Sequence, residues 1–161
     1  MCVIDPAILA RIDALQLRYV RALDTRDMNA WAACFGETGS YICIPRENVE
    51  QYLPVAIMMD DSLARIRDRV TYIAKVWAGT FEDYQTRHFV QRVLCMPRDK
   101  GLIAVESNFL VAYTTARGRS EILVSGTYED EIELTGDDAR FRAKKAVLDT
   151  VTTPRYLVYP I

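Results

Sequence analysis

"LIAVESNFLVAYTTARGRSEILVSGTYEDEIELTGDD", residues 102–138, is the stretch that decides the fold of this chain. Apolar residues recur at every second position over most of it, which is the repeat of a β-strand that covers a core with one face. The segments "ARGR" (116–119) and "TGDD" (135–138) interrupt that repeat with residues that favour turns. The stretch therefore predicts long strands joined by tight connections.

Each of these two strands has one apolar face. Over 102–115 that face consists of Ile103, Val105, Phe109, Val111 and Tyr113, and on the next strand it consists of Ile122, Val124, Tyr128, Ile132 and Leu134. A four-residue loop at 135–138 then predicts the pairs Glu133 with Arg140, Glu131 with Arg142 and Glu129 with Lys144. Opposite charges across a ladder contribute roughly 0.2–1 kcal/mol per pair. We interpret these glutamates as a solvated, self-neutralising face, with an acidic binding site as the alternative.

Further strands are predicted on both sides of this pair, over 86–96 and 139–151. The first is expected to place Arg87, Phe89, Gln91, Val93 and Cys95 on one face and His88, Val90, Arg92, Leu94 and Met96 on the other. Both faces mix polar and apolar groups. That pattern is typical of a strand covered on both sides, here by the protein's own helices and by a partner.

The first third of the chain has the repeat of helices. Asp5 and Pro6 predict a helix start, and the stripe that follows consists of Ile8, Ile12, Leu15, Tyr19 and Leu23. A short helix is expected from Asp27, a strand over 41–45, and a loop with a short strand over 47–58. Asp60 or Asp61 is expected to cap a third helix, whose stripe consists of Leu63, Ile66, Val70 and Ile73.

Helices followed by consecutive long hairpins indicate an α+β domain spanning residues 1–161. We expect the cone-shaped nuclear-transport-factor-2-like (cystatin-like) fold, in which N-terminal helices pack on a strongly curved antiparallel sheet. The net charge of −2 comes from intermixed residues, which excludes a basic stripe for nucleic acid or an anionic membrane. No apolar run is long enough to span a bilayer. The N-terminus lacks a signal peptide's pattern, so a cytoplasmic protein is expected.

Catalytic and metal-binding motifs are scarce. The four cysteines, at positions 2, 34, 43 and 95, form no C-x-x-C and are expected as reduced thiols, with disulfides as the alternative. His88 is the only histidine, which excludes a two-His-one-carboxylate iron centre or a Rieske cluster within this chain. Because "TRHFV" (86–90) lies in a strand pattern, we expect His88 to be buried or interfacial rather than catalytic.

One segment nevertheless suggests an enzyme. "RYVRALDTRDMNAWAACF" (18–35) resembles the start of steroid isomerases of the cone fold, and Tyr19 falls on their oxyanion-binding tyrosine. Their basic carboxylate has its counterpart here at Cys43, between Ile42 and Ile44, so no group is in place to abstract a proton. Tyr19 also fits the apolar stripe of the first helix. A self-sufficient isomerase or lyase is therefore an alternative, as is a module that binds a small apolar ligand.

A different family matches the whole chain. The segments "DDSLARIRDRVTYI" (60–73), "TRHFV" and the closing "KKAVLDTVTTPRYLVYPI" (144–161) resemble the small (β) subunits of aromatic-ring-hydroxylating, Rieske-type dioxygenases. "PREN" (45–48) favours the branch that acts on aromatic acids such as anthranilate, salicylate or terephthalate. The resemblance implies a non-catalytic structural subunit in aromatic-acid catabolism. It does not name the substrate or say whether one or two oxygen atoms are inserted.

The resemblance also implies partners and cofactors. It implies a hexamer of three large (α) and three small subunits, with self-association of the small subunit as a trimer. The Rieske [2Fe-2S] cluster and the mononuclear iron are expected in the large subunit, and no catalytic, cofactor-binding or metal-binding residue is expected here. The interface candidates are Arg65, Asp68, Arg69, Trp77, Tyr84 and His88. For the helical residues a solvated face is the alternative, and Trp77 and Tyr84 would alternatively close the cone.

Overall fold

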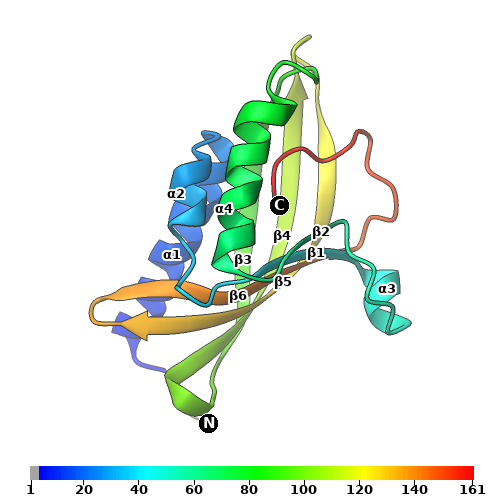
Figure 1. Ribbon diagram of the computed structural model, residues 1–161. Helices are drawn as coiled ribbons and strands as arrows, with labels where there is room; N and C mark the ends of the chain where they lie inside the picture. The colour runs from blue at the N-terminus through cyan, green and yellow to red at the C-terminus, as the bar shows by residue number, and fades with distance from the viewer. Residues whose placement is uncertain (1–3) are drawn as a thin grey trace.

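The computed structural model describes residues 4–161 (Figure 1). Its helices are α1 (Pro6–Asp24), α2 (Met28–Ala32), α3 (Arg46–Glu50) and α4 (Leu63–Tyr72), followed by a π-helical turn η1 (Ile73–Trp77) and a 3-10 turn η2 (Asp99–Gly101). Its strands are β1 (Tyr41–Pro45), β2 (Met58–Asp60), β3 (Tyr84–Pro97), β4 (Leu102–Thr115), β5 (Ser120–Thr135) and β6 (Asp138–Leu148).

The six strands form one curved sheet in the order β2-β1-β6-β5-β4-β3. The four long strands β3 to β6 are consecutive antiparallel hairpins, as the alternating pattern predicts. β1 instead runs parallel to β6, and the short β2 pairs antiparallel with β1. The helices α1, α2 and α4 lie on the same side of the sheet (Figure 1). The expected α+β cone fold is confirmed.

The helices form where capping and apolar periodicity agree. The Asp5 carboxylate accepts a hydrogen bond from the Ala7 amide at 2.9 Å, and Pro6 begins α1. The predicted stripe of α1 faces the core. For α4 the cap is Ser62, whose hydroxyl accepts from the Arg65 amide. The prediction of Asp60 or Asp61 as cap is wrong, because Asp60 ends β2 and pairs with Arg69 instead.

Three β-bulges bend the long strands. Val93 is the extra residue in β3, Leu123 in β5 and Arg142 in β6. A bulge shifts every later side chain to the other face and increases the local twist. Consequently Leu94 and Met96 lie exposed on the outer face, whereas the alternation had placed them with His88. Ile122 is likewise exposed rather than in the core, and Cys95 takes an inner position.

The bulge at Arg142 also changes the predicted charge pairs of the last hairpin. Glu133 lies opposite Arg140, as predicted. Beyond the bulge, Glu131 lies opposite Ala143 and Glu129 opposite Lys145, so the other two predicted pairs are wrong. The extra residue turns Lys144 to the inner face, where its register partner is Asp130.

The segment between β1 and β2 differs from the predicted loop. It forms the short helix α3, a turn, and an extended stretch that returns to β2.

The cysteines within the described residues are reduced thiols, as predicted. Cys34, Cys43 and Cys95 are free, and burial raises the pKa of Cys34 to about 11 and that of Cys43 to about 12. Cys2 lies outside the described residues. No helix within residues 4–161 is long and apolar enough to cross a membrane.

A substitution of Gly126 tests the close approach of β5 and β6. A Cβ at this position would lie 2.0 Å from the Val147 carbonyl oxygen and 3.0 Å from the Phe109 ring. Because the first atom belongs to the backbone, Gly126→Ala must push the strands apart. We expect a loss of about 1–3 kcal/mol of unfolding free energy, measured in urea. Ser125→Ala, at the neighbouring half-buried position, should change it by less than about 0.5 kcal/mol. Equal effects of the two substitutions would contradict this packing.

Candidate functional site: the filled cone and its outer surfaces

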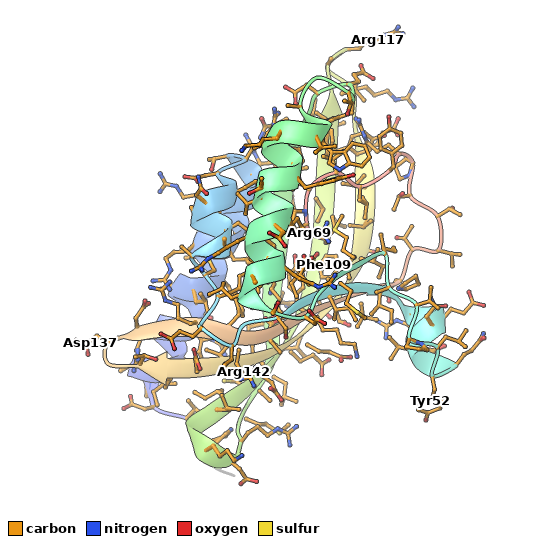
Figure 2. The ribbon with its side chains drawn as sticks, viewed as in Figure 1. Tyr52, Arg69, Phe109, Arg117, Asp137 and Arg142 are labelled. Carbon is orange, nitrogen blue, oxygen red and sulfur yellow. The ribbon has the colours of Figure 1, made fainter. Side chains whose placement is uncertain are left out.

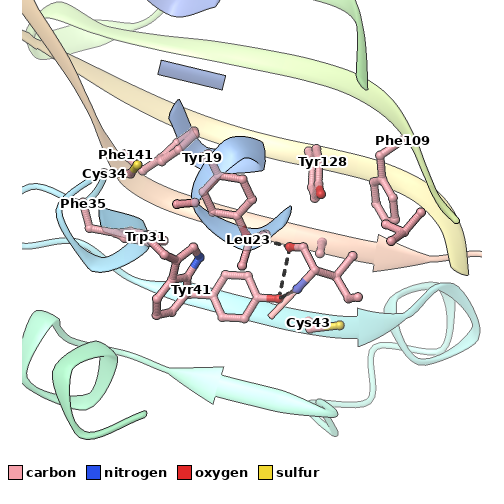
Figure 3. Close-up of a cluster of buried hydrophobic side chains, with 14 of the residues drawn as sticks. Tyr19, Leu23, Trp31, Cys34, Phe35, Tyr41, Cys43, Phe109, Tyr128 and Phe141 are labelled. Atoms are coloured by element: carbon pink, nitrogen blue, oxygen red, sulfur yellow. Dashed lines mark hydrogen bonds between the residues drawn. The ribbon is translucent and has the colours of Figure 1, made fainter. Parts of the chain in front are cut away.

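The interior of the cone is filled by aromatic rings (Figure 3). The largest fully buried side chains include Tyr19, Trp31, Tyr41, Tyr128 and Phe141. Tyr19 and Phe141 meet edge to face with ring centres 5.4 Å apart, and Trp31 and Tyr41 do so at 5.6 Å. This geometry is the preferred one for aromatic pairs and adds to the energy of burial.

The last residues close the interior. Residues 149–161, here called the strap, run from the end of β6 back to the centre of the molecule (Figure 1). The Ile161 amide donates to the Tyr41 hydroxyl at 2.8 Å, and the Tyr19 hydroxyl donates to the Ile161 main-chain oxygen at 2.6 Å. Dashed lines in Figure 3 mark hydrogen bonds at the Tyr41 hydroxyl. The strap therefore occupies the two hydroxyls that face the interior from α1 and β1.

The arrangement around Tyr19 does not provide proton abstraction. Burial raises the pKa of Tyr19 well above its ordinary value, and its hydroxyl is engaged by Ile161. Cys43, at the position of the isomerase base, is fully buried, and burial raises its pKa to about 12. A thiol with that pKa stays protonated at neutral pH and is no general base. Tyr19 packs in the core, which was one of its two predicted roles.

A buried ion pair lies among the rings, and the sequence prediction missed it. The Lys144 ammonium nitrogen is 3.0 Å and 3.2 Å from the two carboxylate oxygens of Asp130, and neither side chain is exposed. The Gln16 amide donates to Asp130 at 2.6 Å and accepts from Lys144 at 3.3 Å. The ammonium also lies 3.6 Å from the centre of the Tyr128 ring.

Burial acts on both partners of this pair. Desolvation raises the pKa of Asp130 and lowers the pKa of Lys144, and the attraction between the two groups opposes both shifts. Shifted groups of this kind often mark active sites. Here, however, rings and Gln16 surround the pair. In the sequence, Asp130 lies two residues from Tyr128 and two from Ile132, which both face the core. The period-two repeat of a strand therefore places Asp130 on the inner face as well.

The predicted interface residues of α4 have different surroundings. Arg69 binds Asp60 through two guanidinium nitrogens, the second at 3.0 Å, and both residues lie largely inside the chain. Arg65 is exposed and pairs with Asp61 at 3.3 Å, one helical turn away. Asp68 is exposed. Arg69 thus fastens α4 to β2, whereas Arg65 and Asp68 face outward.

Two of the three remaining interface candidates, Trp77 and Tyr84, contact the strap. The half-buried Trp77 packs its ring between Tyr72 and Tyr156, with ring centres 6.3 Å from each. Tyr84 is buried, and the Arg155 guanidinium of the strap lies 3.9 Å from its ring centre. Tyr84 is therefore covered by the strap of its own chain.

His88 lies between β3 and α1 with a side chain only 2% exposed. Its Nδ1 is 2.6 Å from one Asp24 carboxylate oxygen, and its backbone amide donates to the other oxygen at 3.1 Å. Burial alone would raise the pKa of Asp24, but the hydrogen bonds and the charge of His88 together lower it. His88 is thus a buried histidine bound to a carboxylate, as predicted. Within residues 4–161, no three side chains of the kinds that bind metals are grouped as a metal site.

Comparison with known proteins identifies the family. The family model described as "Ring hydroxylating beta subunit" matches residues 18–155. This chain belongs to the ring-hydroxylating beta-subunit family. The resemblance seen in the sequence is confirmed, and the isomerase and ligand-binding alternatives are not favoured.

Relatives within the family include proteins of the aromatic-acid branch. The chain is 32% identical over 147 residues to the anthranilate 1,2-dioxygenase small subunit of Burkholderia cepacia, covering 91% of this chain and 90% of that protein. It is 22% identical over 151 residues to a terephthalate 1,2-dioxygenase terminal oxygenase subunit, beta 2, of Comamonas sp, covering 94% of this chain and 97% of the relative.

A solved structure confirms the cone fold. The beta subunit of a putative aromatic-ring-hydroxylating dioxygenase from Novosphingobium aromaticivorans superposes with a TM-score of 0.81 at 27% identity, over 92% of this chain and 94% of the other. The overall fold of this chain, helices packed on a curved sheet, is therefore similar to that of this beta subunit.

The adjacent residues Lys144 and Lys145 offer a matched test of the buried pair. Lys144→Met leaves a buried carboxylate without its cation, and we expect a loss of about 3–5 kcal/mol in unfolding free energy. Lys145→Met removes an exposed pair with Glu129 and should cost less than about 1 kcal/mol. Adding Asp130→Asn to Lys144→Met should recover much of the loss. Urea unfolding measures these losses. If the losses from Lys144→Met and Asp130→Asn simply added in the double variant, the coupling between the two side chains would be contradicted.

The His88 contact predicts a pH-dependent contribution to stability. Because the folded-state pKa of Asp24 lies below its ordinary 3.8, the stabilisation is complete above that value and is lost as pH falls through the folded-state pKa. His88→Ala should therefore lower the unfolding free energy more at pH 6 than at pH 3. His88→Asn keeps a donor for Asp24 and should lose less unfolding free energy at pH 6 than His88→Ala. A loss for His88→Ala that is equal at pH 6 and at pH 3 would refute this assignment.

Proposed function

We propose that this chain is the non-catalytic small subunit of a ring-hydroxylating dioxygenase that acts on an aromatic acid. The filled cone carries the proposal, because the space that an enzyme of this shape would use for substrate holds buried rings and the strap. The anthranilate and terephthalate relatives support an aromatic acid as the substrate class. The contribution of this chain is then to build and stabilise the assembly.

The cofactors belong, in this proposal, to a large subunit. A Rieske cluster and a mononuclear iron with two histidines and one carboxylate each need two histidines. This chain has one histidine, and its ring is held by Asp24. The large subunit therefore carries both iron centres, and a reductase supplies electrons from NADH.

The proposed assembly contains three large and three small subunits in the cytoplasm. Arg65, Asp68 and Trp77 remain candidates for contacts between chains, because their side chains reach the surface. An indirect role is assigned to Arg69, Tyr84 and His88, because each binds a neighbour within its own chain. These bonds hold the contact surface in its shape. Any influence of this subunit on substrate preference is then transmitted through the shape of the contact surface.

Tyr19→Phe distinguishes this function from a cone enzyme. The variant loses the hydrogen bond to Ile161, which should cost about 0.5–1.5 kcal/mol of unfolding free energy. Co-expressed with the large subunit, it should keep the wild-type rate of aromatic-acid hydroxylation. The wild-type chain alone should show no turnover in either a hydroxylation or an isomerisation assay. Turnover by the isolated chain that disappears with Tyr19→Phe would overturn the proposal.

A further inference from the structure

The strap has two parts with different surroundings. Residues 150–154, here called the tether, are mostly exposed, and Val151 is 71% exposed. Within residues 4–161, no hydrogen bond or ion pair joins the tether to a helix or strand. Residues 155–161, here called the plug, are mostly covered, and Val158 and Ile161 are each only 2% exposed. The strap is therefore a loose tether that carries a docked plug.

The plug is held by side chains rather than by the sheet. At its inner end the Ile161 amide donates to the Tyr41 hydroxyl, and the Tyr19 hydroxyl donates to the Ile161 main-chain oxygen. At its outer end the Arg155 guanidinium donates to the Glu82 carbonyl at 2.8 Å. Within the described part of the chain, the plug forms no backbone-to-backbone hydrogen bond with a helix or strand. The plug can therefore leave without breaking a bond of the sheet or of any helix.

The contacts of the plug are those of a peptide in a binding groove. The Tyr159 ring packs edge to face with the rings of Phe81 and Tyr84, with ring centres 6.0 Å from each. The ring centres of Tyr156 and Trp77 are 6.3 Å apart. Aromatic side chains lodged among rings, together with main-chain groups bonded to side-chain hydroxyls, are what a recognition site for an extended apolar peptide provides.

The start of the strap has its own attachment to the fold. The Asp149 amide donates to the Ser125 carbonyl of β5 at 2.9 Å, and the Asp149 carboxylate pairs with Arg46. The tether thus lies between an anchored start and a docked end, which is the place of a hinge. A segment without ladder hydrogen bonds opens at a lower free energy than the sheet to which it is attached.

We propose that the plug is an intramolecular ligand that opens as a unit on its tether while the sheet and helices stay folded. The surface beneath it, here called the plug site, consists of Tyr19, Tyr41, Trp77, Phe81 and Tyr84. This site also binds the same peptide when the peptide is supplied in trans. Because a short tether gives the plug a high effective concentration, a free peptide competes only when the plug is weakened. The inference goes beyond the proposed function, since it concerns this chain alone.

Labelling of Cys43 by a thiol reagent reports the opening. Cys43 is fully buried and lies two residues from Tyr41 on β1, so both side chains face the interior (Figure 3). Burial raises the pKa of Cys43 to about 12, so the thiol reacts only after opening exposes it to water. Ile161→Ala removes the buried end of the plug, and we expect the labelling rate of Cys43 to rise about tenfold or more. Peptide mass spectrometry reads each cysteine separately.

Addition of the plug in trans tests the plug site itself. A synthetic peptide with the sequence RYLVYPI, residues 155–161, should return the Cys43 rate of the Ile161→Ala chain toward the wild-type rate, and the effect should saturate. A scrambled peptide of the same composition should not. Arg155→Gln loosens the outer end of the plug and leaves its inner end unchanged, so it should also raise the Cys43 rate, and the same peptide should lower that rate again.

Three controls separate opening of the plug from loss of the fold. Val151→Ala changes an exposed side chain of the tether, and Arg117→Ala changes the tip of the β4–β5 hairpin (Figure 2). Both variants should leave the Cys43 rate unchanged. Cys34 is buried and bonds through its thiol to the Ala30 carbonyl of α2. It should label at the wild-type rate in every variant, because the helices and the sheet stay folded.

The possible outcomes decide the proposal. An increase of the Cys43 rate that is absent at Cys34 and is reversed only by the RYLVYPI peptide supports it. Parallel increases at Cys43 and Cys34 would mean that the whole fold opens, which overturns it. An unchanged Cys43 rate in both Ile161→Ala and Arg155→Gln, or a peptide that protects no better than its scrambled form, overturns it as well.

Discussion

The buried pair of Lys144 and Asp130 is the constraint on which the rest of the structure depends. Two charges without solvent exposure are tolerated only when they meet each other and their remaining hydrogen-bonding groups are satisfied. That condition fixes the register of β5 against β6 and requires the bulge at Arg142. It also fixes α1, because Gln16 bonds to both charges. Helix and sheet are therefore held together at one point in the centre of the cone.

The closed interior follows from the same arrangement. The ammonium group of Lys144 lies against the rings of Tyr128, Tyr19 and Phe141, and the strap accepts a hydrogen bond from the Tyr19 hydroxyl. Within residues 4–161, the interior of the cone is thus filled by the protein's own side chains. What the cone offers to other chains is its outer surface, which carries exposed apolar side chains such as Tyr52 and Ile122.

The sequence predicted the elements well where local signals agree. Asp5 and Pro6 with the stripe that includes Tyr19 predicted α1, and the alternation over 102–115 predicted the faces of β4. It failed at the bulges, because one extra residue such as Val93 or Arg142 leaves no mark in a period-two pattern yet moves every later side chain. The buried Lys144 was therefore predicted as an exposed partner of Glu129. The cap of α4 was misjudged because the carboxylate of Asp60 is taken by Arg69, which is a contact set by tertiary structure.

Because the lone histidine, His88, is held by Asp24, we assign the iron centres to the proposed large subunit. The central claim is tested most directly by purifying this chain through a tag from cells that also produce its large subunit, and by determining the composition and iron content of the product. The account predicts that a large subunit co-elutes, that iron and sulfide are present, and that the small chain separated from the complex is free of iron. A small chain that elutes alone and turns over a substrate by itself would contradict it.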